Sequence, residues 1–89
     1  MDDKDHRYSH VHSVWKAGDL SSFSMIFRII PRSVVAADMG LNYERLASKL
    51  ENPSKFLFRD IQKLSTLVDI PFMDLIKLVS LAIQANQPA

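Results

Sequence analysis

The feature that most constrains this chain is one glycine, Gly40, set between two stretches of helical character. The 89 residues hold only one other glycine, so residues 36–53, AADMGLNYERLASKLENP, place Gly40 where one helix ends and another begins at once. Glycine adopts the left-handed conformation that ends many helices, and the side chain of Asn42 can cap the helix that follows. The stretch therefore predicts two short helices joined by a tight turn.

Apolar residues recur at helical spacing through the rest of the chain, and prolines separate the segments. The pattern predicts helices over 10–16, from a cap at Ser21 or Ser22 to Ile30, from about Pro31 to Met39, over 43–50, from Leu57 to 68 and over 72–84. No stretch alternates as a strand would. We therefore predict the all-α class, with five to six short helices.

The length allows one small domain. We expect a flexible polar N-terminal arm over residues 1–9, a single helical domain over 10–85 and a loose tail over 86–89. The chain has no cysteine, so it has no disulfide framework. No apolar run reaches the roughly 20 residues that span a bilayer, and the acidic start is unlike a signal peptide. These features predict a cytoplasmic protein without membrane contact.

Charge is unevenly distributed along the chain. The net charge is only +1, but residues 28–63 carry seven Lys or Arg against four Asp or Glu, an excess of three. The flanking segments are slightly acidic. The middle of the chain is thus the part best suited to a polyanion, although charge alone would bind one weakly.

The turn at Gly40 gives this segment a specific interpretation. Small residues, Ala36 and Ala37, allow the first helix to lie close to the second, while Leu41 and Leu46 are placed to pack beneath the turn. Two short helices joined in this way form the helix-turn-helix unit, which we expect over about residues 32–50. In that unit the outward face of the second helix enters the major groove of DNA.

The run VVAADMGLNYERLASKLENP resembles the helix-turn-helix of the phage-repressor-like family, the lambda-repressor or Cro-like DNA-binding domains. The following run, FRDIQKLSTLVDIPFMDLIKLV, is similar to the C-terminal helix pair of that family. The run SFSMIFRIIPRSVVAADMGLNYERL also looks like small bacterial proteins of this type, and the likeness covers about residues 20–80. The resemblance implies a lambda-repressor-like fold that binds double-stranded DNA and regulates transcription without a cofactor.

The chain departs from the family pattern in two places: its second helix is one residue longer, and the next helix begins with the apolar Phe56 or Leu57. The outward residues of the second helix, together with positions that the family pattern adds, give the predicted DNA contacts. These are Arg32, Ser33, Asn42, Tyr43, Arg45, Ser48, Lys49 and Lys55. Arginine pairs with guanine and asparagine with adenine in the major groove, whereas lysine and serine suit phosphate.

A different interpretation of the same residues stays open. Arg45 and Lys49 are one helical turn apart and equally fit an ordinary solvated face, and Glu44 and Glu51 could either repel phosphate or orient an arginine. The alternative function is therefore a protein-interaction module, including an antitoxin-like one, on a helix-turn-helix scaffold that does not bind DNA. A basic surface free of the two acids would favour DNA, whereas acids within it would favour a protein partner.

Other chemistries find little support. His6, His10 and His12 could suggest a metal, but no fourth ligand is evident, so we predict none. The chain has no glycine-rich phosphate loop, no Ser-His-Asp spacing and no paired carboxylates in an apolar setting, so we predict no enzyme.

The last helix is apolar around most of its circumference. A helix of that kind is buried or paired, and a second copy is the simplest partner for so small a protein. We therefore predict a homodimer that contacts through Phe72, Leu75, Leu78 and Ala82.

Overall fold

The computed structural model describes residues 4–86, which form six α-helices and one short 3-10 helix and contain no strand. The elements are α1 (Arg7–Lys16), α2 (Phe23–Ile29), α3 (Arg32–Met39), α4 (Tyr43–Glu51), η1 (Pro53–Lys55), α5 (Phe58–Val68) and α6 (Phe72–Asn86). The predicted all-α class is confirmed. After the first helix, the observed boundaries lie within about two residues of the predicted ones, the usual uncertainty of helix ends.

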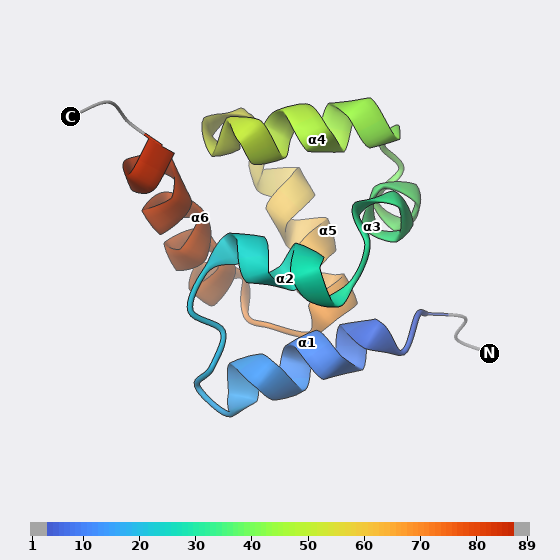
Figure 1. Cartoon of the computed structure of the whole chain (residues 1–89), viewed down its shortest axis with the longest axis vertical. Helices are drawn as coiled ribbons and strands as arrows, with labels where there is room; N and C mark the ends of the chain where they lie inside the picture. Colours follow the sequence, from blue (N-terminus) through green and yellow to red (C-terminus); the bar gives the residue numbers. More distant parts are fainter. Residues whose placement is uncertain (1–3, 87–89) are drawn as a thin grey trace.

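The helices pack around α5, which contacts α1, α3 and α6. Figure 1 shows α1 and α4 along opposite edges of the molecule, with α5 between them and α6 along a third edge. The side chains that form the core come from every α-helix, and the most deeply buried include Val11, Ile26, Val35, Leu46, Leu64 and Leu75. Two exposed edges, α4 and α6, are consequently available for partners.

Local signals explain most of the helix ends. Proline tolerates the first turn of a helix but not its interior, and both η1 and α6 begin at or directly after one, Pro53 and Pro71. α5 ends at Asp69, whose φ of 56° is left-handed. The hydroxyl of Ser65 donates to the carbonyl of Ile70 at 2.6 Å, which holds the chain as it leaves this turn.

The N-terminal segment differs from the prediction of a flexible arm over residues 1–9. Residues 1–3 lie outside the described part, but α1 begins at Arg7, three residues earlier than expected. The Asp5 carboxylate accepts a hydrogen bond from the Arg7 backbone N–H at 2.9 Å and pairs with the Arg7 guanidinium at 2.8 Å. These hydrogen bonds hold the pKa of Asp5 well below its usual value. They explain why the helix starts early.

Tyr8, placed by prediction in the arm, belongs to the core. Its side chain is buried, and its hydroxyl donates to the carboxylate of Asp38 on α3 at 2.7 Å. Burial, helped by the hydrogen bond to Asp38, raises the pKa of Tyr8 above its ordinary value. The first turn of α1 is thereby joined to the unit that carries Gly40.

The opposite end of the chain is also more structured than predicted. Asn86, expected in the tail, is the last residue of α6, and its side-chain amide donates to the backbone carbonyl of Glu51 at 2.9 Å. This contact ties the end of α6 to the end of α4. The remaining predicted tail, residues 87–89, lies outside the described residues.

Candidate nucleic-acid interface

The turn between α3 and α4 is built on the left-handed conformation predicted for Gly40, whose φ is +74°. The Gly40 N–H donates to the carbonyl of Ala37 at 3.1 Å, and the Leu41 N–H donates to that of Ala36 at 2.9 Å. This pair of bonds is the Schellman motif, which satisfies carbonyls at a helix end. The Nζ of Lys63 donates to a third carbonyl there, that of Met39, at 3.2 Å.

Asn42 starts α4 as predicted. Its Oδ1 accepts a hydrogen bond from the Arg45 backbone N–H at 2.7 Å, the arrangement expected of an N-terminal cap. The side-chain oxygen that would meet adenine is therefore already bonded within the helix. One lone pair of the oxygen is engaged in the cap, whereas the NH2 group of the Asn42 amide makes no hydrogen bond within residues 4–86.

Close packing fixes the two helices at a steep angle to each other. Val35, Ala36 and Met39 of α3 are buried, as is Leu46 of α4, so small and apolar side chains lie between the two helices. In Figure 1, α3 is seen almost end-on while α4 lies across the picture. The outer side of α4 faces away from every other helix.

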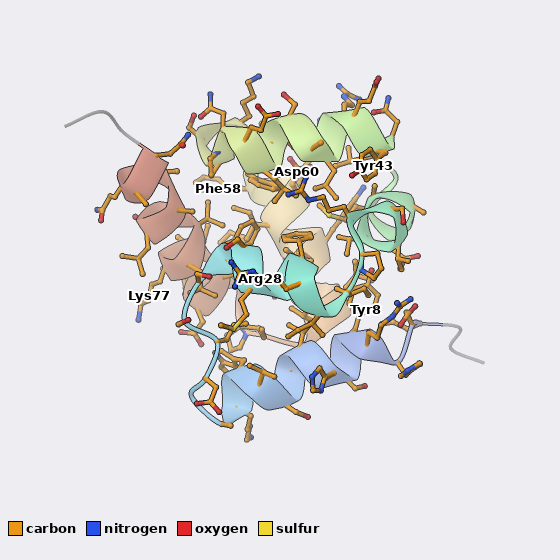
Figure 2. All side chains as sticks on the ribbon, viewed as in Figure 1. Tyr8, Arg28, Tyr43, Phe58, Asp60 and Lys77 are labelled. Carbon is orange, nitrogen blue, oxygen red and sulfur yellow. The ribbon has the colours of Figure 1, made fainter. Side chains whose placement is uncertain are left out.

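The structure brings three of the eight predicted DNA contacts, Arg45, Ser48 and Lys55, to this outer side and to the end of it. Tyr43 is 52% exposed at the start of α4 but lies on the side toward α3, where Figure 2 labels it, whereas Arg45 is exposed in the first turn of the helix. Ser48 is half-buried, and its hydroxyl accepts a hydrogen bond from the Nζ of Lys55 at 3.1 Å. Together these side chains run from the start of α4 to η1.

Arg32 and Ser33 lie apart from that row, in the first turn of α3. Both are exposed, and α3 has no side-chain cap at its start. The N-terminus of a helix carries partial positive charge and unpaired N–H groups, which favour a nearby anion. Their position therefore suits contact with a phosphate.

The prediction that Lys49 faces outward is wrong. Its side chain is only 14% exposed and forms an ion pair with Asp60 of α5 at 2.8 Å. The Nζ of Lys49 also donates to the Lys55 carbonyl at 3.1 Å and lies 5.9 Å from the centre of the Phe56 ring. Lys49 thus joins α4 to α5 from beneath, where Figure 2 labels Asp60.

Asp60 is a residue that the sequence interpretation missed. Its side chain is 8% exposed, and its Oδ2 also accepts the Leu57 backbone N–H at 2.9 Å, which caps the start of α5. Burial acts to raise the pKa of Asp60, but the hydrogen bonds from Lys49 and Leu57 and the charges of Lys49 and Arg59 outweigh it and lower the pKa. Asp60 supplies one half of a capping box, and because Leu57 has no side-chain oxygen for the other half, the sequence pattern did not show it.

Acidic residues share the outer side of α4. Glu44 and Glu51 are both exposed, and their spacing of seven residues, with Ser48 between them, places them along one line of the helix. With Lys49 withdrawn, the predicted basic surface is reduced and the acids interrupt it. The geometry of this face is therefore that of a mixed polar surface with its cations at Arg45 and Lys55.

The predicted dimer contacts on α6 are only partly accessible. Leu75 is fully buried in the core of its own chain, so its assignment to an interface is wrong: the apolar pattern did not show which side faces inward. Phe72, Leu78 and Ala82 are half-buried against that core. What a second copy could reach on α6 therefore differs from the predicted set.

The described residues add two observations about other chemistries. Residues 4–86 contain no group of three His, Cys, Asp or Glu side chains that could hold a metal ion, and His12 Nδ1 lies 2.8 Å from the Asp69 carbonyl. Within the same part of the chain, none of the helices combines the length and apolar character needed to cross a membrane.

Comparison with known proteins adds no further assignment. No protein-family model, curated protein or solved structure matches the chain. The likeness to phage-repressor-like domains therefore stays a prediction drawn from residues 20–80.

Proposed function

We propose that the chain binds double-stranded DNA through the α3–turn–α4 unit and acts as a lambda-repressor-like transcriptional regulator. The observation that carries this proposal is the position of α4. It crosses α3 at a turn fixed by Gly40 and Asn42, and its outer side is free of other helices. A helix held in this way can lie in a major groove while the helix before it approaches the DNA backbone.

Each exposed residue then has a role suited to its chemistry. Arg45 reads guanine through its two-pronged guanidinium, and Tyr43 offers its ring to a thymine methyl. Lys55, held beside Ser48, neutralises a phosphate at the far end of α4, while Arg32 and Ser33 meet another at the start of α3. Mechanistically, the protein occupies an operator and carries out no chemistry.

The test is binding to random-sequence duplex DNA over a salt series, followed by fluorescence anisotropy. Binding should weaken as salt rises, and Arg45→Ala should weaken it further. Lys55→Ala removes a proposed phosphate contact and should reduce the slope of log affinity against log salt by about one. Lys49→Ala is unsuitable here because it would break the Lys49–Asp60 ion pair.

Arg28→Ala is the matched control. It removes the same charge from an exposed position on α2, labelled in Figure 2, and leaves α4 untouched. We expect it to change affinity much less than Arg45→Ala does. Equal losses in the two variants, or no binding at low salt, would contradict the proposal.

Glu44 and Glu51 interrupt the basic surface, which is the arrangement expected to favour a protein partner, and this supports a second candidate function. Two carboxylates on the outer line of α4 repel phosphate but suit a basic protein surface. In this alternative the helix-turn-helix scaffold binds a protein in place of DNA. Replacing the two acids distinguishes the candidates, because it would strengthen contact with DNA and weaken contact with a basic partner.

A further inference from the structure

The side of α6 that faces solvent carries two large apolar side chains with one charge between them, and the exposed polar residues Ser80 and Gln84 lie on the same side. Met73 is 63% exposed and Leu81 is 57% exposed, and Lys77 lies midway between them. Residues four apart lie on the same face of a helix. We call these three residues, Met73, Lys77 and Leu81, the α6 stripe.

No element of the described chain covers the α6 stripe. The opposite side of α6 holds the buried Leu75 and Val79, and α6 contacts α2, α5 and η1. Figure 1 shows α6 at the edge of the molecule, and in Figure 2 Lys77 points away from the other helices. Lys77 makes no ion pair or hydrogen bond within residues 4–86.

Apolar surface continues beyond both ends of the stripe. Next to Met73, the ring of Phe72 contacts that of Phe58 edge-on, with centres 6.2 Å apart, and Phe58 is 76% exposed. Next to Leu81 there is a groove of about 390 Å³ between the start of α2 and the end of α6, with Leu50 and Pro53 in its lining. Apolar surface therefore gathers at both ends of α6, and exposed apolar patches of this kind mark interaction sites.

Lys77 decides between a second copy and a different protein. In a symmetric dimer that buries the whole stripe, antiparallel helices would place Met73 of one copy against Leu81 of the other. Parallel helices would place each residue against the same residue of the second copy. Both arrangements place Lys77 against Lys77. Like charges in contact oppose association, so the stripe is poorly complementary to itself.

We infer that the α6 stripe docks an amphipathic helix of another protein, one that presents a carboxylate between two large apolar side chains. The carboxylate pairs with Lys77, and the apolar side chains, one helical turn to either side of the carboxylate, cover Met73 and Leu81. The inference does not depend on DNA binding, because α4 and the stripe lie along different edges of the molecule.

The test uses synthetic helices of about 18 residues, cross-linked because short helices are marginally stable in water. Each has leucines eight residues apart on one face and differs only at the midpoint, which is Glu or Lys. The full chain should bind the Glu peptide about fivefold more tightly than the Lys peptide, as expected for a partly exposed charge pair exchanged for a repulsion. Lys77→Glu should reverse that preference.

Two further variants make the result decisive. Lys16→Glu makes the same charge change at an exposed position on α1 and should keep the original preference. Met73→Ser/Leu81→Ser should abolish binding of both peptides while its thermal unfolding stays close to that of the wild type, because both side chains are exposed.

Three results would overturn the inference. The first is that neither peptide binds, and the second is that Lys77→Glu fails to reverse the preference. The third is sedimentation of the wild type as a dimer that Met73→Ser/Leu81→Ser dissociates, which would identify the occupant as a second copy. None of these measurements involves DNA, so their outcome is separate from that of the proposed function.

Discussion

The helices α4 and α6 both lie along an edge of the molecule, yet their free sides differ in chemistry. The outer side of α4 is polar and carries Arg45 among exposed acids, whereas the outer side of α6 exposes the large apolar side chains of Met73 and Leu81 beside Lys77, Ser80 and Gln84. Both helices are anchored from within, α4 by Leu46 and the Lys49–Asp60 pair and α6 by Leu75.

The difference shows that one small core can support two unlike surfaces. A polar helix face has no need of a partner to be stable in water, so its function depends on the arrangement of its charges. Large apolar side chains exposed on a helix leave hydrophobic surface in water. A partner that covers this surface is the expected reason for their exposure. The predictions below separate the anchoring side of each helix from its free side.

The largest effect should come from the inner side of α6. Leu75→Ala removes a fully buried side chain and should lower the free energy of unfolding by about 3 kcal/mol, whereas Leu81→Ala at an exposed position should change it by less than about 0.5 kcal/mol. Urea unfolding of the two variants measures both values. Similar losses would mean that α6 is not packed as described.

The inner side of α4 should be nearly as sensitive. Asp60→Ala leaves the mostly buried Lys49 without its partner and should cost about 3 kcal/mol. Asp60→Asn keeps an oxygen for the Leu57 N–H and should cost less. Comparison of the two variants therefore separates the contribution of the ion pair to the free energy of unfolding from that of the helix cap. Equal unfolding energies for wild type and Asp60→Ala would contradict the anchoring role.

The Lys49–Asp60 ion pair should also make the stability of the protein depend on pH in the acidic range. The folded-state pKa of Asp60 is lower than its unfolded value, so the native state binds fewer protons in that range. Its contribution to stability is present above about pH 4 and is lost as pH falls through the folded-state pKa. Urea unfolding at several acidic pH values should show a shallower loss for Asp60→Asn than for the wild type.

Substitutions of Gly40, in the turn between α3 and α4, should lower the free energy of unfolding by a smaller amount. Gly40→Ala places a side chain at a φ of +74° and should cost about 1 kcal/mol. Gly40→Asn should cost less, because asparagine tolerates the left-handed conformation better than alanine does. Calorimetry on the three proteins checks the order, and a costlier asparagine would argue against the turn geometry.

The contact between α1 and α3 should give an effect of similar size. Tyr8→Phe removes the hydrogen bond to Asp38 and should cost about 1 kcal/mol. The pKa of Tyr8 is raised in the folded state, so the stability it contributes is present below about pH 10 and is lost as pH rises through the raised value. Alkaline unfolding of the variant should therefore depend less on pH than that of the wild type.

Local signals in the sequence were sufficient to predict most of the fold. Gly40, Asn42, Pro53 and Pro71 act through the backbone of their own segment, and the helix ends they predict are observed. The helices themselves follow from apolar spacing. Both kinds of information are carried by neighbouring residues, which is why one sequence suffices to find them.

The errors arose where a side chain finds its partner far along the chain. Lys49 looked solvated because its spacing from Arg45 is that of an exposed pair, whereas its actual partner, Asp60, is eleven residues away. Tyr8 looked like part of a polar arm because Asp38 is thirty residues away. On α6 the apolar pattern runs almost all round, so only the packed structure shows which side is free.

The measurement that most directly tests DNA binding by the outer side of α4 is duplex affinity in the Glu44→Gln/Glu51→Gln variant at low salt. Both residues are exposed, so folding should be unaffected, and thermal unfolding provides the control. If α4 lies on DNA, removing two charges that repel phosphate should tighten binding several-fold and steepen its dependence on salt. Unchanged affinity, or no binding by either protein, would contradict the proposal and favour a protein partner on this face.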